Sequence, residues 1–133
     1  MRGAKPHLVV DNDAVKATAA PGWLSKDAKA EWRRVMPILV SRKILTTADL
    51  GSLENYCTAT GQVREMERRL QVDGHVVEEE GKLKRHPAVG IQSDAMTRAR
   101  LLAAELGLTP VSRSRPTIRE DGDDDGSNPL DVS

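Results

Sequence analysis

The feature that most constrains the fold is one long amphipathic stretch in the middle of the chain. Between residues 48 and 72 an apolar or small side chain recurs every three or four positions, at Leu50, Leu53, Cys57, Thr60, Val63, Met66 and Leu70. This period matches one face of an α-helix and not a β-strand, so it predicts a helix of roughly 25 residues. A helix this long with one narrow apolar stripe needs partner helices to cover it.

A shorter helix is predicted before this long one, over residues 25–40. Ser25 is a good N-cap, and Asp27 lies in the first turn, where a carboxylate complements the helix dipole. Pro37 lacks a backbone donor and is expected to kink the last turn. We interpret Trp23 and Trp32 as hydrophobic anchors of this helix, because both fall at the start of its amphipathic pattern.

A hairpin and a third helix are predicted after the long one. Residues 75–79 and 82–85 are typical of two short strands, with Glu80-Gly81 as a tight turn. Helical spacing returns after residue 87, and Gly107 followed by Pro110 is a strong stop signal.

These elements together predict a mainly α fold, with a three-helix core, a long central helix and a short β-hairpin. We place this helical core at residues 23–110. Residues 1–22 are expected to form a basic, flexible arm. Residues 111–133 form an acidic tail that has too little apolar surface to fold alone.

The overall formal charge of zero hides four blocks of alternating sign. Residues 1–44, 45–81, 82–119 and 120–133 carry net charges of +5, −5, +6 and −6. Such blocks indicate separate surfaces, the basic ones suited to phosphate and the acidic ones to basic proteins. The single cysteine and the lack of a long apolar run lead us to expect a soluble cytoplasmic protein without a disulfide or a membrane span.

The motifs of catalysis and of metal binding are missing, so we expect no enzyme activity, no cofactor and no metal. His75 and His86 could face each other at the base of the hairpin, but two imidazoles without a third ligand rarely hold a transition metal. The acidic runs at 78–80 and 123–125 lack the fixed geometry of a magnesium site. Cys57, on the inner stripe of the long helix, is interpreted as a core residue.

Three sets of candidate functional residues follow from the charge and the apolar pattern. Basic residues in the arm, at helix ends and in loops are candidates for phosphate contacts with DNA: Arg2, Lys5, Arg33, Arg34, Arg42, Lys43, Lys82, Lys84, Arg85, Arg113 and Arg115. The stripe of the long helix is the candidate surface for self-assembly, through Leu50, Leu53, Cys57, Val63, Met66 and Leu70. The tail is a candidate docking segment, through Asp123, Asp124, Asp125, Leu130 and Val132.

Several segments, taken in order, resemble the small terminase subunits of tailed double-stranded DNA bacteriophages. The similar stretches cover residues 1–115 and comprise Met1-Arg2-Gly3-Ala4-Lys5-Pro6, Pro21-Gly22-Trp23-Leu24-Ser25, Ala30-Glu31-Trp32-Arg33-Arg34, Leu45-Thr46-Thr47-Ala48-Asp49, Tyr56-Cys57, His86-Pro87-Ala88 and Ala103-Ala104-Glu105-Leu106-Gly107-Leu108-Thr109-Pro110, followed by Ser112-Arg113. The resemblance implies a ring-forming adaptor in the host cytoplasm that binds double-stranded viral DNA at the start of packaging. It also implies that the adaptor brings this DNA to the large terminase subunit, which holds the ATPase and the nuclease. Many of these proteins place a helix-turn-helix before the assembly core, whereas here only the helix at 25–40 precedes the long one.

Two other classes of function remain open from the residues alone. A helix-turn-helix-type transcriptional regulator would be a dimer with tight, specific DNA binding. A phage structural scaffold would bind no nucleic acid and would pair its basic blocks with acidic blocks of neighbouring copies.

Overall fold

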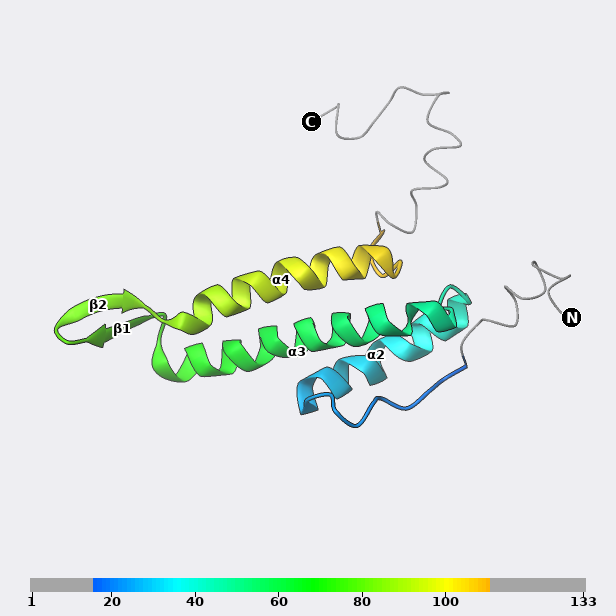
Figure 1. Cartoon of the computed structure of the whole chain (residues 1–133), viewed down its shortest axis with the longest axis horizontal. Coiled ribbons are helices and arrows are strands. Elements are labelled where there is room, and N and C mark those ends of the chain that lie inside the picture. The colour runs from blue at the N-terminus through cyan, green and yellow to red at the C-terminus, as the bar shows by residue number, and fades with distance from the viewer. Residues whose placement is uncertain (1–15, 111–133) are drawn as a thin grey trace, which may run out of the picture.

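The computed structural model describes residues 16–110 and shows three helices and a hairpin in that range (Figure 1). In chain order the elements are α2 (Lys26–Arg42), the short 3-10 helix η1 (Thr47–Asp49), α3 (Leu50–Asp73), β1 (Val76–Glu79), β2 (Lys82–Arg85) and α4 (Pro87–Glu105). The predicted mainly α fold is confirmed. Figure 1 shows α3 at the centre, with α4 alongside it and α2 covering the part near its N-terminus.

Local signals in the sequence explain where α2 begins and ends. The Ser25 side chain accepts a hydrogen bond from the Ala28 backbone N–H at 3.2 Å. The helix continues through Pro37 to Arg42, two residues further than predicted, and stops at Lys43, which has a left-handed φ of 57°. Thr46 and Asp49 then form a capping box, with the Asp49 carboxylate accepting from the Thr46 backbone N–H at 2.9 Å.

The central helix packs unusually close to α2 at one point. A Cβ built on Gly61 would lie 2.9 Å from the backbone nitrogen of Ala28, which is closer than real Cβ atoms approach. Gly61 and the small Ala28 therefore let the two helix backbones meet. The core is formed by buried residues of α2, α3 and the segments beside the helices: Leu24, Ala28, Trp32, Val35, Met36, Leu39, Leu45, Leu53, Tyr56, Cys57 and Leu106. The helix α4 packs against it through partly buried Ala99, Leu102 and Ala103.

The hairpin has the turn that its sequence predicts. Glu80 and Gly81 both have positive φ values, 54° and 77°, as a two-residue type I′ turn requires. The two antiparallel strands pair Val76 with Arg85 and Glu79 with Lys82. Figure 1 shows the hairpin projecting beyond the adjoining ends of α3 and α4.

The predicted start and stop of the third helix are also found. His86 caps α4, its Nδ1 accepting from the Ala88 N–H at 2.9 Å. At the other end the N–H of Gly107 bonds to the carbonyl of Ala104 at 3.2 Å, and that of Leu108 to the carbonyl of Ala103 at 2.8 Å. This pair of bonds, with Gly107 at a φ of 73°, is a Schellman motif.

Two expectations about the first helix and the segment before it need correction. Trp32 is buried and its indole N–H donates to the Thr18 carbonyl at 2.7 Å, but Trp23 is 63% exposed and anchors nothing. The cause is the turn at Pro21–Leu24, which buries Leu24 in place of Trp23. Thr18 and Ala20, assigned to the flexible arm, contact the core, so the packed part of the chain begins before residue 23.

None of the helices described within residues 16–110 is long and apolar enough to cross a membrane. The predictions for the first part of the arm and for the acidic tail lie outside the described residues.

Candidate functional site

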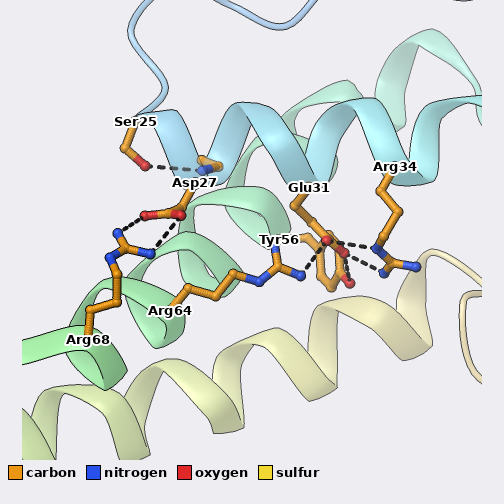
Figure 2. A network of polar contacts seen from close by, with 8 residues as sticks. Ser25, Asp27, Glu31, Arg34, Tyr56, Arg64 and Arg68 are labelled. Carbon is orange, nitrogen blue, oxygen red and sulfur yellow. Dashed lines mark hydrogen bonds and ion pairs between the residues drawn. The ribbon is translucent and has the colours of Figure 1, made fainter. Parts of the chain in front are cut away.

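A fully buried carboxylate joins α2 to α3. Glu31 has 0% of its surface exposed, although it lies in the apolar stripe of α2 beside Trp32. Arg34 donates to it twice, at 2.9 and 2.6 Å, Tyr56 donates its hydroxyl at 2.6 Å, and Arg64 donates at 2.9 Å. Figure 2 shows these three donors converging on the carboxylate from two helices.

The donors decide the charge state of this cluster. Burial by itself would raise the pKa of Glu31, but the hydrogen bonds from Arg34 and Tyr56 outweigh it and hold the pKa below its ordinary value. Burial, and then the hydrogen bond to Glu31, raises the pKa of Tyr56, so its hydroxyl stays protonated. Glu31 is therefore a fixed anion, and the cluster holds α2 on α3.

A second ion pair lies further toward the start of α2. Arg68 of α3 donates to both carboxylate oxygens of Asp27, one of the contacts being 3.1 Å long (Figure 2). This hydrogen bond from Arg68 lowers the pKa of Asp27. The side chain of Arg68 is 62% exposed, so water screens this pair more than the Glu31 cluster.

These two contacts leave the outer face of α2 strongly basic. Asp27 and Glu31 are the acids of α2, and both are neutralised by arginines of α3. Lys26, Lys29 and Arg33 follow the spacing i, i+3 and i+7, which places them on one face of the helix. Lys26 and Arg33 are exposed and Lys29 is half-buried, so we name these three residues the α2 basic stripe.

A shallow groove runs beside the α2 basic stripe. It has a volume of about 360 Å³ and is lined by Thr18, Ala19, Ala20, Lys29, Trp32, Arg33, Met36 and Pro37. Sequence reasoning selected Arg33 and passed over Lys26 and Lys29, although their helical spacing was readable. It also missed Glu31, whose signal is a lone carboxylate in an apolar stripe.

The other predicted basic residues fall into separate places. Arg34 forms an ion pair with Glu31, which makes it a weaker candidate for contacts with DNA phosphates than its exposed neighbour Arg33. Arg42 and Lys43 are exposed at the end of α2, and Arg42 donates to the Gly107 carbonyl at 3.3 Å. The three on the hairpin, Lys82, Lys84 and Arg85, are exposed at the opposite end of the molecule (Figure 1). Arg2, Lys5, Arg113 and Arg115 lie outside the described residues.

The predicted assembly residues divide into two groups. Leu53, Cys57 and Leu70 are buried inside the single chain, with exposures of 0, 0 and 2%, so they contact the chain's own helices and are not available to another copy. Leu50, Val63 and Met66 are half-buried and reach the surface. Val63 lines an open groove of about 470 Å³ with Arg64, Glu67, Arg68, Gln92 and Met96.

The groups considered for metal binding or reactivity have structural surroundings. In residues 16–110 no cluster of three or more His, Cys, Asp or Glu side chains could hold a metal. His86 Nε2 lies 2.9 Å from the Asp73 carboxylate, and its backbone N–H donates to the His75 carbonyl at 2.8 Å. Burial raises the pKa of Cys57 to about 12, which keeps the thiol protonated and unreactive. The tail candidates Asp123, Asp124, Asp125, Leu130 and Val132 lie beyond the described residues.

Comparison with known protein families gives a match over most of the chain. Residues 28–123, well over half of the chain, match the family described as phage terminase, small subunit. No curated protein and no solved structure shows a significant match.

Proposed function

The chain belongs to the family of phage terminase small subunits, and from this premise we propose that it is a non-catalytic adaptor of viral genome packaging. In this proposal it binds double-stranded viral DNA in the host cytoplasm, assembles with copies of itself into a ring, and recruits the large terminase subunit. The observation that carries the DNA-binding step is the uncompensated α2 basic stripe.

The charge of α2 supports phosphate contacts on physical grounds. Arginines of α3 neutralise both acids of the helix, so no carboxylate of α2 competes with DNA for Lys26, Lys29 or Arg33. Side chains on one helix face reach neighbouring phosphates and fix the orientation of a protein on a duplex without reading its sequence. Arg42 and Lys43 extend the positive charge to the end of the helix.

The structure offers less support for a transcriptional regulator with α3 as the recognition helix. A recognition helix places its N-terminal residues against base edges in the major groove. The first basic residue of α3 is Arg64, more than three turns into the helix, and α2 packs against the earlier turns. We therefore expect contacts that depend on phosphate and not on base sequence.

The test of DNA binding compares two variants with the same change in charge. Lys26→Glu/Arg33→Glu alters the stripe, and Arg98→Glu/Arg100→Glu alters two exposed arginines of α4. Fluorescence anisotropy with a viral DNA duplex should show that the first variant binds DNA with an affinity about 10- to 100-fold lower than the wild type. The slope of log affinity against log salt should fall by about 2, because each lost phosphate contact contributes about 0.9.

Equal losses in both variants would mean that net charge, and not the stripe, governs binding. No DNA binding by the wild-type chain at low salt would favour the scaffold function instead.

Recruitment of the large subunit is assigned to the acidic tail. Its acids would steer encounter with a basic groove, and Leu130 and Val132 would fill small pockets. Deleting residues 116–133 should abolish capture of the large subunit and leave assembly mass and DNA affinity unchanged. If the deletion instead tightens DNA binding and capture persists, the tail covers the chain's own basic surface.

A further inference from the structure

The β-hairpin has an exposed surface that the fold of one chain does not use. All four residues of β2 are exposed, and Val76 and Leu83 are 58% and 77% exposed. The register pairs Val76 with Arg85 and Glu78 with Leu83, so both apolar side chains lie on the same face. A two-stranded hairpin alone is only marginally stable in water. Apolar side chains that stay exposed give it no additional burial to stabilise it.

Both edges of the hairpin also carry open backbone groups. Within the described residues the sheet has two strands only, so each strand has one strand neighbour. The His86 N–H bonds to the His75 carbonyl, and hydrogen-bonded pairs alternate along an antiparallel ladder. The outward-facing N–H and carbonyl groups are therefore those of Val76 and Glu78 on β1, and of Leu83 and Arg85 on β2.

The two edges carry opposite charge. β1 ends in Glu78 and Glu79, and the turn adds Glu80, whereas β2 contains Lys82, Lys84 and Arg85. Within the hairpin the observed ion pair joins Lys84 to Glu79 at 2.8 Å, and both side chains are more than half exposed. An exposed pair of this kind is worth little and exchanges readily for another partner.

We propose that the hairpin is an assembly edge, in which β1 of one copy pairs with β2 of the next copy. This inference rests on the proposed ring, and it names the contact that would close it. Charge decides the partner: β1 against β1 would oppose glutamates, and β2 against β2 would oppose lysines, whereas β1 against β2 opposes unlike charges. Such a head-to-tail contact is heterologous, the kind that closes into rings.

Strand direction agrees with this arrangement. In a ring all copies are related by rotation about one axis, so strands lying along that axis keep their direction in every copy. β1 and β2 are antiparallel within the chain, so β2 of one copy and β1 of the next would also be antiparallel. The hairpins would then continue as one sheet, the mode of strand addition at an open edge. The proposal assigns Lys82, Lys84 and Arg85 to assembly in place of DNA.

Charge-swapped variants test the contact between copies directly. The acidic-edge variant is Glu78→Lys/Glu79→Lys, the basic-edge variant is Lys82→Glu/Lys84→Glu, and a fourfold variant carries both changes. Asp94→Lys/Glu105→Lys on α4 is the control with the same charge change as the acidic-edge variant. Native mass spectrometry measures assembly, and circular dichroism checks that the helices of each variant are intact.

Each edge variant alone should fall to the 14.5 kDa mass of one chain, while the α4 control keeps the wild-type mass. The fourfold variant should assemble again, and so should an equimolar mixture of the two edge variants, because the lysine edges of one then meet the glutamate edges of the other. Rescue in the mixture cannot arise within one hairpin.

Two results would overturn the inference alone: wild-type assembly by the acidic-edge variant, or no rescue in the mixture. A wild-type chain that is itself monomeric would instead refute the ring of the proposed function, and this contact with it.

Discussion

Replacing Glu31 with glutamine should destabilise the chain far more than an ordinary surface change. Glu31→Gln keeps the size of the side chain and one acceptor oxygen, but it removes the negative charge that Arg34, Arg64 and Tyr56 share. Removing one partner of a fully buried ion pair costs about 3–5 kcal/mol, because the other charge stays buried. Here the arginine side chains are 58% and 42% exposed, and water can solvate them after the change.

We therefore expect a loss of about 2–3 kcal/mol in the free energy of unfolding, below the range for a fully buried pair. For a domain of this size that corresponds to a fall in Tm of roughly 10–20 °C. Urea denaturation at one protein concentration, followed by the fluorescence of buried Trp32, measures the change. The control is Glu65→Gln on the exposed face of α3, which should change stability by less than about 0.5 kcal/mol.

The dependence on pH gives an independent check of the same cluster. The pKa of Glu31 in the folded chain lies below the ordinary value of 4.5. Its charge therefore stabilises the fold fully above pH 4.5, and this contribution is lost as the pH falls through the lowered pKa. The difference between wild type and Glu31→Gln should be constant from pH 7 to about 5 and should shrink below the ordinary glutamate pKa. A Glu31→Gln loss no larger than that of the Glu65 control at pH 7 would refute the reasoning.

Three further predictions concern single residues. Gly61→Ala should cost about 1–3 kcal/mol in urea denaturation, because its Cβ would meet the Ala28 backbone, whereas Gly51→Ala, with open space around it, should stabilise by about 0.5–1 kcal/mol. Gly107→Ala should cost about 1–2 kcal/mol, because its φ is 73°, and a neutral result in the same assay would count against the Schellman stop. Cys57 should resist a thiol reagent at pH 8 and react fully in urea; rapid labelling of the folded chain would contradict its burial and its raised pKa.

The fold was predictable because its determinants are local. Capping at Ser25, the capping box at Thr46 and Asp49, the two-residue turn and the stop at Gly107 each depend on a few neighbouring residues. The fate of Trp23 was not predictable in this way. A tryptophan and a leucine side by side both fit an apolar start to the helix, and the turn geometry decides which one is buried.

The site residues were less predictable, because their environment depends on contacts between helices. Sequence spacing allows an i, i+3 pair between Glu31 and Arg34, but it could not show that Tyr56, which lies 25 residues away, also donates to the buried carboxylate. Nor could the stripe of α3 reveal which of its members the chain itself covers. A helix that packs between two others buries side chains on both contact faces. Leu53, Cys57 and Leu70 are buried in this way by the chain's own helices.

The alternating charge blocks acquire a different meaning once the chain is folded. The contacts between α2 and α3 use the minority charges of each block: the acids Asp27 and Glu31 from the basic block pair with the arginines Arg68 and Arg64 from the acidic one. Each such pair neutralises two charges that would have reduced the net charge of their own blocks. Folding therefore increases the charge difference between the two helices. The α2 basic stripe stays unpaired with acids of α2, while two of the three arginines of α3 are neutralised by acids of α2. The same division is repeated at small scale in the hairpin, where one strand is acidic and the other basic and the two face outward in opposite directions. A chain with zero net charge can in this way carry local fields of both signs on separate surfaces.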